Sequence, residues 1–307
     1  MAAPKDPILS IVVPVAEVDK FWLKQLLRVR GSVEFVLVYP PGSKIEKIKD
    51  LRVKQIISPL RGEVTQRLVS IINSRGKYLL SINDDELVHP DILNLVQWYF
   101  TRFKNSWVVV PRKKGVAFQN KDLLKTAKWA PTPRIKNLEV VASGQKHLSL
   151  LQIPIVPIDK KKLDFRLLFF GKRKDQYGAH IENSDHRIWK ADLLRNAAFD
   201  LIKDMNFKAI KYMPFWCMDR LLSLYVQAKY FKKGIIIGHR IIGSDSLEEA
   251  QLRVIDIDPL KGRHRRFYVA ADALLLRRFP KYAYFWNLVI SGIYGIPYRI
   301  FNRIKGS

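Results

Sequence analysis

Two short apolar runs constrain the fold of this chain more than any other feature. Residues 8–14 and 33–39 are rich in valine and isoleucine, the first run ends in Pro14, and Pro40 follows the second. Such runs predict buried strands closed by loops. Between them, apolar residues recur at helical spacing over residues 18–28, which predicts a helix. A strand, a helix and a strand in close succession indicate a right-handed crossover between parallel strands.

The same alternation continues along the chain. Residues 54–58 and 77–82 predict two more strands, and residues 63–74 predict the helix between them. Another helix is expected after residues 89–91, followed by a strand at residues 107–110. Strands that alternate with helices are typical of a parallel sheet covered on both faces. The sequence therefore predicts an α/β fold with a mostly parallel central sheet flanked by helices.

The second half of the chain is less regular. Prolines and a lysine run interrupt residues 115–184, where residues 148–155 and 163–170 are strand candidates. Further on, the pattern predicts three helices, at residues 187–196, 219–230 and 270–278, and a strand at residues 234–242. We expect one continuous domain over residues 1–245 and a basic, aromatic-rich C-terminal extension over residues 246–307.

The charge of the chain predicts an anionic partner. Its 54 Lys and Arg against 28 Asp and Glu give a formal net charge of +26, while 48% of the residues are hydrophobic. That apolar content excludes a disordered polycation, since the chain can bury a core. The partner could be nucleic acid, a phosphorylated small molecule or an acidic membrane face. The sequence contains no recognisable nucleic-acid-binding motif, and no nucleic-acid partner is expected.

Cellular location is also predicted from composition. Cys217 is the single cysteine, which excludes an internal disulfide framework and fits a reducing compartment. The apolar run at residues 8–16 is too short to span a bilayer. We therefore expect a cytoplasmic protein. Residues 282–298 form an uncharged aromatic stretch flanked by arginines and lysines, which predicts contact of residues 263–307 with an anionic membrane; the alternative is a terminal helix packed on the domain.

A cluster of three acidic residues preceded by an asparagine, Asn-Asp-Asp-Glu at residues 83–86, follows the predicted strand 77–82 and is called the acidic motif below. Loops at the carboxyl ends of parallel strands are where ligands bind in α/β folds. Two readings remain open: the aspartates cap the next helix, or they hold a divalent metal and a diphosphate. Mg²⁺ and Mn²⁺ prefer carboxylate oxygens, and substrate phosphates complete their coordination.

Residues 67–93 resemble the nucleotide-sugar-binding core of GT-A glycosyltransferases, in which a helix leads through a glycine turn into a strand that ends in an Asp-x-Asp-type motif. The resemblance covers residues 8–112 and 187–243. Two distant variants of this fold compete: residues 10–14 and 187–194 are similar to family-2 glycosyltransferases, whereas residues 83–113 and 217–219 resemble the exostosin-type transferase domain. The resemblance implies that residues 8–112 bind the nucleotide sugar and residues 113–245 bind the acceptor.

The resemblance also implies roles for single residues. Asp85 corresponds to the metal-binding last member of the motif, with Asp84 beside it, and Asn83 stands where many relatives have a ribose-contacting aspartate. Tyr39 stands where family-2 members usually have an acidic residue that helps to hold the base; it would stack on the base or be buried at the strand end. The remaining implied binding residues are Pro14, Arg67 and Arg265 for the nucleotide sugar and His239 for the metal.

Asp219 is the expected catalytic carboxylate. The resemblance implies that it accepts the proton of the acceptor hydroxyl in an inverting reaction, or stabilises the transition state in a retaining one; the residue type alone is equally compatible with a helix cap. Together these features predict a glycosyltransferase that uses Mn²⁺ or Mg²⁺ and a UDP- or GDP-sugar, with a hydroxyl of a glycan or lipid-linked glycan as acceptor. The alternatives are a noncatalytic, membrane-peripheral protein of the GT-A fold and a basic nucleic-acid-binding protein.

Overall fold

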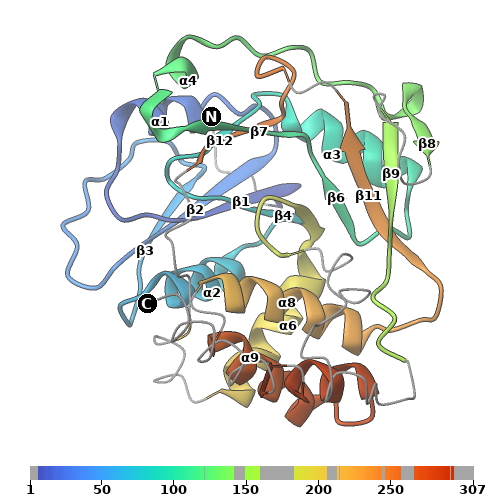
Figure 1. Cartoon of the computed structure of the whole chain (residues 1–307). Helices are drawn as coiled ribbons and strands as arrows, with labels where there is room; N and C mark the ends of the chain where they lie inside the picture. The colour runs from blue at the N-terminus through green and yellow to red at the C-terminus, as the bar shows by residue number, and fades with distance from the viewer. Residues whose placement is uncertain are drawn as a thin grey trace, which may run out of the picture.

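The computed structural model describes residues 6–120, 122–141, 149–159, 183–205, 213, 215–243, 246–256, 266–290 and 292–293. These residues form two sheets with helices on both faces of the larger one (Figure 1). The larger sheet contains β1 (Leu9–Pro14), β2 (Val33–Tyr39), β3 (Val53–Ile57), β4 (Tyr78–Ser81), β6 (Val108–Val110), β8 (Glu139–Val141), β9 (Ser149–Pro154), β10 (Ile188–Lys190) and β11 (Ile236–Ile242). The smaller sheet contains β5 (Leu87–Val88), β7 (Lys113–Ala117) and β12 (Leu252–Asp256).

The helices are α1 (Lys20–Leu26), α2 (Glu63–Asn73), α3 (Ile92–Arg102), α4 (Leu123–Thr126), α6 (Ala191–Asp204), α8 (Phe215–Lys229) and α9 (Arg266–Arg278), with 3₁₀ turns at Phe118–Asn120 and Ile135–Asn137.

The strand order of the large sheet is β3-β2-β1-β4-β10-β6-β11-β9-β8. Five of its eight pairings are parallel and the other three, two of which involve β10, are antiparallel. The expected α/β fold with a mostly parallel central sheet is confirmed.

The two faces of the large sheet build two separate apolar cores. Along β1, Val12 packs into the core shared with α2, α6, α8 and α9, whereas Ile11 and Val13 pack into the core shared with α1 and α3. This alternation follows from the period of two in a strand. Because helices cover both faces, all six residues of β1 are buried, as expected for an interior parallel strand.

A buried carboxylate fixes the turn that leads into β4. Glu34 on β2 accepts hydrogen bonds from Ser10 Oγ at 2.5 Å and from the backbone N of Gly76 at 3.0 Å. A Cβ atom at Gly76 would lie 2.4 Å from Ser10 Oγ and 2.6 Å from Ser10 N, so only glycine fits there. The close approach holds the start of β4 against β1, and thereby sets where β4 ends.

Most of the elements expected from the sequence are present, with differences at their ends, and the structure adds short strands that were not expected, among them β5, β7, β8 and β12. Residues 188–190, expected to be helical, form β10, which inserts antiparallel between β4 and β6. Residues 113–117, for which no strand was expected, form β7, which pairs parallel with β12. The strand candidate at residues 163–170 lies outside the described residues.

Residues beyond 245, expected as an extension, contribute side chains to both apolar cores. Strand β12 pairs with β5 and β7, and Leu275 of α9 is buried in the same core as α8, together with Tyr284 and Phe285. Among the residues that the structure describes, no helix combines the length and the apolar content needed to cross a bilayer.

Candidate active site

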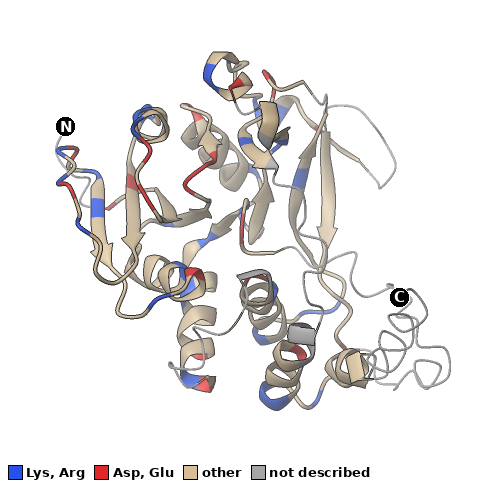
Figure 2. Ribbon diagram, turned by 60° about the vertical axis from the view of Figure 1, so that its left-hand side comes forward, with Lys and Arg blue, Asp and Glu red and all other residues tan. Residues whose placement is uncertain are grey.

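The acidic motif, residues 83–86, follows β4 at the edge of the sheet where the parallel strands β1 and β2 also end. Figure 2 shows Asp and Glu interspersed with Lys and Arg along the ribbon. Pro14 ends β1, where it is buried and pairs with Val38. Two residues later, the backbone N of Ala16 donates a hydrogen bond to Asp84 Oδ2 at 2.8 Å. The loop after β1 and the acidic motif are therefore joined.

The motif does not cap the next helix. Helix α3 begins at Ile92, after an N-cap position occupied by Asp91, so the capping interpretation of Asp84 and Asp85 is wrong. Asp85 is half-buried. Burial raises the pKa of Asp85 to about 6, and the negative charges of Glu86 and Asp84 add to the effect. A carboxylate crowded in this way favours a nearby cation.

Arg67 is the centre of the site. Its side chain on α2 is 1% exposed and donates five hydrogen bonds, one for each guanidinium N–H. Nη1 donates to Asp185 Oδ1 at 2.8 Å and to Ser81 Oγ at 2.6 Å, Nη2 donates to Asn83 Oδ1, and both Nε and Nη2 donate to Glu63 Oε1, at 3.1 and 3.0 Å. These bonds occupy every N–H of the guanidinium, so none is left for the nucleotide sugar that Arg67 was expected to bind.

Residues 184–186 complete the site and were not found from the sequence. His186 Nε2 contacts Glu86 Oε1 and lies 3.3 Å from Asp185 Oδ2, while Lys113 Nζ lies 3.5 Å from its Nδ1. The backbone of His186 is left-handed, with φ 56°, and its N donates to Ser81 O at 2.9 Å. The available signal was the position of these residues directly before residues 187–194, which resemble a family-2 segment.

Asp219 is linked to the motif through this segment. Its Oδ1 accepts hydrogen bonds from Ser184 Oγ at 2.6 Å and from the backbone N of Asp185 at 2.7 Å. Asp219 is the fifth residue of α8, which begins at Phe215, so the capping interpretation is wrong here too. Asp219 is 3% exposed, and burial together with the charge of Asp185 raises its pKa to about 6. A chain of contacts therefore runs from Asn83 through Arg67 and Asp185 to Asp219.

Of the predicted site residues that the structure describes, His239 is not brought to this cluster. His239 on β11 is buried against α3, where its Nδ1 lies 2.8 Å from Tyr99 Oη and its ring centroid 4.3 Å from that of Phe103. Burial lowers the pKa of His239 to about 4, with a contribution from Arg102. Arg265 lies outside the described residues.

Tyr39 is buried at the end of β2 and is 4% exposed. Its hydroxyl accepts a hydrogen bond from Gln55 Nε2 at 3.1 Å. Of the two roles expected for this residue, the structure shows the buried strand-end aromatic.

The donor set suits a metal that is shared with a diphosphate. No group of three His, Cys, Asp or Glu side chains within the described ranges is arranged to hold a metal ion by itself. Asp84 and Asp85 supply carboxylate oxygens at a half-buried position, and Mg²⁺ or Mn²⁺ usually takes only one or two carboxylates when substrate phosphates complete its coordination. The residues present therefore fit such an ion better than a metal held in a protein cage.

No family model matches the chain, and no curated protein matches it in sequence. Solved structures do match. Residues 1–349 of S. aureus TarS in complex with UDP align with a TM-score of 0.49 and 13% identity over 88% of this chain and 64% of that chain. The chain thus spans less than two thirds of that TarS fragment.

Two further structures are similar. Glucosyl-3-phosphoglycerate synthase from Mycobacterium tuberculosis, in complex with Mn²⁺, UDP and glucosyl-3-phosphoglycerate, aligns with a TM-score of 0.44 and 14% identity over 91% of this chain and 82% of that chain. The mannosyltransferase PcManGT from Pyrobaculum calidifontis, in complex with GDP-Man and Mn²⁺, aligns with a TM-score of 0.43 and 13% identity over 95% and 75%. The structural neighbours of the chain are thus glycosyltransferases, as the sequence resemblance led us to expect.

Proposed function

We propose that the protein is a divalent-metal-dependent glycosyltransferase. It moves a sugar from a UDP- or GDP-sugar to a hydroxyl of a glycan or lipid-linked glycan. One observation carries the proposal: Arg67 and Asp185 connect the acidic motif at the end of β4 to Asp219 by direct hydrogen bonds. The network thereby holds Asn83, which directly precedes Asp84 and Asp85, together with a carboxylate suited to accept a proton.

Asp85, with Asp84 beside it, would hold Mn²⁺ or Mg²⁺ together with the donor diphosphate. When bound, such an ion acts as a Lewis acid that stabilises negative charge on the departing diphosphate. Arg67 has a positioning role in this proposal, because its donors fix Asn83, Ser81 and Asp185. The nucleotide is bound through the loop after Pro14, which Ala16 ties to Asp84.

Asp219 is the proposed base. A pKa near 6 leaves most of the carboxyl ionised at neutral pH, and makes it a stronger proton acceptor than an ordinary aspartate. In an inverting reaction Asp219 accepts the proton of the acceptor hydroxyl as that oxygen attacks the anomeric carbon. In a retaining reaction the same carboxylate would stabilise the positive charge that develops on the sugar ring.

Calorimetry with UDP and GDP, with and without Mn²⁺, tests the proposal. We expect binding that requires the metal. Asp85→Asn should abolish that binding, whereas Asp219→Asn should leave it intact and remove sugar transfer. Asp192→Asn is the matched control, since Asp192 is 84% exposed on α6 and should change neither. Absence of metal-dependent nucleotide binding in the unchanged chain would refute the proposal, and nucleotide binding without turnover of any donor would favour a noncatalytic protein of the same fold.

Contact with an anionic membrane remains a second part of the proposal. The observation that favours it is Trp286, which is 44% exposed and lies within ten residues of Arg277, Arg278 and Lys281 in the sequence, since tryptophan flanked by cations suits a membrane interface. Trp286→Gln should weaken sedimentation with phosphatidylserine vesicles. The control is Trp98→Gln on α3, because Trp98 is similarly exposed at 38%; equal effects of both changes would exclude this surface.

A further inference from the structure

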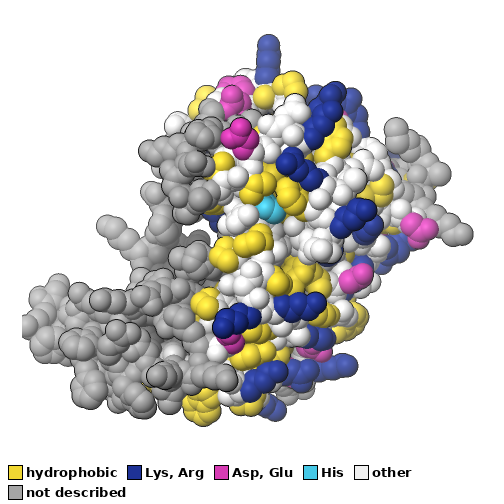
Figure 3. Space-filling model, turned by 90° about the vertical axis from the view of Figure 1, so that its right-hand side faces the viewer, with side chains coloured by type: hydrophobic (Ala, Val, Ile, Leu, Met, Phe, Trp, Pro, Cys, Tyr) yellow, Lys and Arg dark blue, Asp and Glu magenta, His cyan; other side chains and the backbone are white. Residues whose placement is uncertain are grey.

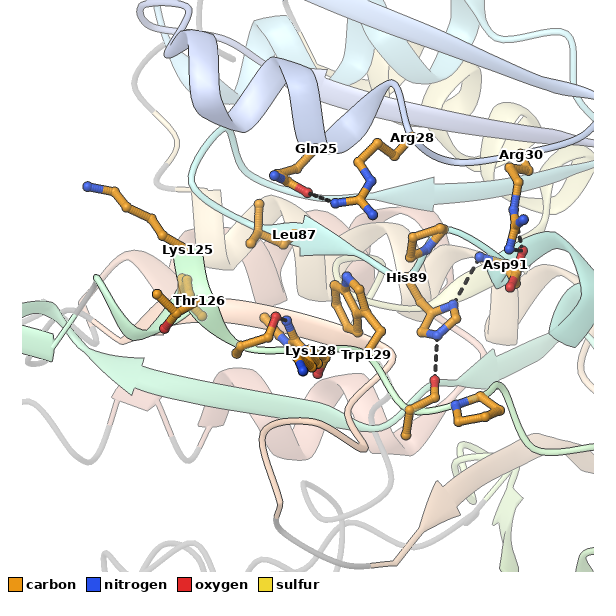
Figure 4. A pocket seen from close by; sticks show the side chains of 16 residues that line it. Gln25, Arg28, Arg30, Leu87, His89, Asp91, Lys125, Thr126, Lys128 and Trp129 are labelled. Atoms are coloured by element: carbon orange, nitrogen blue, oxygen red, sulfur yellow. Dashed lines mark hydrogen bonds and ion pairs between the residues drawn. The ribbon is translucent and has the colours of Figure 1, made fainter.

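A cavity of about 760 Å³ lies between the smaller sheet and the helices on the same side of the large sheet (Figure 4). Its walls come from the end of α1, from Leu87 to Asp91 between β5 and α3, from residues 124–131 and from Arg253 on β12. None of the carboxylates of the candidate active site lines it. Its volume falls within the range of small-molecule sites.

Positive charge dominates the lining. Five cationic side chains face a single carboxylate, Asp91; the cations are Arg28, Arg30, Lys125, Lys128 and Arg253. Asp91 is already paired with Arg30, whose Nη2 lies 2.5 Å from Asp91 Oδ1. Lys125 pairs with Asp122 on its own helical turn. The charges of Arg28, Lys128 and Arg253 remain in excess within the cavity.

Arg28 and Lys128 have no carboxylate partner in the described part of the chain. Arg28 Nη1 donates to the neutral Gln25 Oε1 at 3.0 Å, and Figure 4 shows this pair across the cavity from Lys128 and Trp129. Both cations are exposed, so their side chains are free to reach a bound molecule. Arg28 and Lys128 thus bring positive charge to two walls of the cavity.

Arg253 adds a buried positive charge to the cavity wall. Its side chain is 1% exposed and lies 3.6 Å over the Trp129 ring. It donates to three backbone carbonyls, those of Leu247 at 3.1 Å, Ala127 at 2.9 Å and Lys128. Burial lowers the pKa of Arg253 to about 10, although Glu248 opposes the shift. Carbonyl dipoles hold the guanidinium in place without cancelling its charge, so the cavity keeps a positive potential.

We propose that this cavity binds a small phosphorylated molecule, whose phosphate is held between Arg28 and Lys128. Guanidinium groups match phosphate oxygens in geometry, and ammonium groups bind them as point charges. The remaining volume, beside His89 and Trp129, accommodates the organic part of the molecule. The site is independent of metal and of the carboxylates at the end of β4.

Calorimetric titration of the full chain with glucose 6-phosphate, in EDTA and 0.15 M NaCl, tests this site. The double variant Arg28→Gln/Lys128→Gln should weaken binding at least tenfold. The control is Lys20→Gln/Lys24→Gln, which removes the same charge from exposed positions of α1 outside the cavity and should change affinity less than twofold. Asp85→Asn should bind glucose 6-phosphate unchanged, which separates this site from the candidate active site.

Inorganic phosphate and glucose serve as comparison ligands. Phosphate should compete with glucose 6-phosphate, and glucose should not bind. The proposal is overturned if the unchanged chain binds neither phosphate nor glucose 6-phosphate, if both double variants lose affinity equally, which would indicate attraction by net charge alone, or if glucose binds as tightly as its phosphate.

Discussion

The buried carboxylate of Asp219 destabilises the folded chain at neutral pH, whereas a residue that serves only packing would stabilise it. Its pKa rises from 3.8 to about 6 on folding, mainly through burial. The folded chain therefore holds a proton that the unfolded chain releases, and stability falls as pH rises from about 4 to 6. Two pKa units correspond to a destabilisation of at most about 3 kcal/mol above pH 6. The hydrogen bonds from Ser184 and from the backbone of Asp185 lower this pKa, which would be higher still without them.

Asp219→Asn should separate stability from catalysis. The amide oxygen can still accept both hydrogen bonds, and the buried charge is removed. We expect the free energy of unfolding in urea at pH 7.5 to stay equal or to rise by up to about 2 kcal/mol, while sugar transfer falls by about 10²- to 10⁴-fold. A variant that is destabilised and also loses nucleotide binding would show that Asp219 is a structural residue.

The pH dependence of turnover should report the same group. If ionised Asp219 accepts the proton, kcat should fall about tenfold per pH unit below pH 6 and level off above it. The rate is measured with saturating donor and metal between pH 5 and pH 8. Asp219→Asn should show a flat profile over this range for its residual activity, and a profile unchanged by the substitution would contradict the assignment.

Arg67→Leu should be among the most damaging single changes in the chain. It would leave Asp185, 4% exposed, without its buried cation, and breaking a buried ion pair in this way costs about 3 to 5 kcal/mol. Arg278→Leu is the control. Arg278 ends α9, is 44% exposed and pairs with Asp200 and Asp204 of α6, so its loss should change the free energy of unfolding by less than about 1 kcal/mol. Urea unfolding followed by circular dichroism measures both; similar losses would mean that the Arg67 network contributes little.

At the scale of elements, β11 depends on one glycine. A Cβ at Gly238 would lie 1.9 Å from the carbonyl oxygen of Val108 on β6, so Gly238→Ala must push the two strands apart. We expect a loss of at least about 2 kcal/mol. Gly234→Ala is the control: its φ of 74° carries strain of about 1 kcal/mol, but nothing lies within 4 Å. The midpoint of thermal unfolding should be clearly lower for Gly238→Ala than for Gly234→Ala, and equal midpoints would contradict this packing.

Elements whose pattern is local were predictable from the sequence, and those defined by distant partners were not. Strands β1 and β2 read as buried runs because both faces of the sheet are covered. Strand β10 has only three residues between a loop and a helix, and its identity depends on pairing with β4 and β6. Strand β7 was not expected, because only Val116 of its five residues is buried and the segment therefore contains no apolar run.

The candidate site divides in the same way. Asp84, Asp85 and Asp219 could be proposed from the sequence because each belongs to a recognisable local pattern. Asp185 and His186 were missed because their partners, Arg67 and Glu86, lie 118 and 100 residues away in the chain. His239 was misleading, because a histidine at the expected strand can equally fill a core, as its packing against α3 shows.

At the scale of the whole molecule, the net charge of +26 is not concentrated in one place. Figure 3 shows Lys and Arg scattered between hydrophobic and neutral side chains over one face of the molecule. Scattered charge raises the rate at which anionic ligands reach the protein, and salt screens this effect. Specific recognition then depends on local sites, such as the candidate active site and the cavity lined by Arg28, Lys128 and Arg253, where the geometry of a few residues determines which ligand is bound.

The C-terminal region shows how far the molecule extends as one packed unit. Phe285 is fully buried, with its ring centroid 6.0 Å from that of Phe279, whereas its neighbour Trp286 is 44% exposed. Phe285→Ala should therefore cost about 3 to 5 kcal/mol, and Trp286→Ala should change the free energy of unfolding by less than about 0.5 kcal/mol. Urea unfolding of the full chain, followed by circular dichroism, measures both. If residues 246–307 were a separable extension, Phe285→Ala would leave the main transition unchanged; a single transition shifted by Phe285→Ala alone would show that the region after β12 belongs to the same cooperative core.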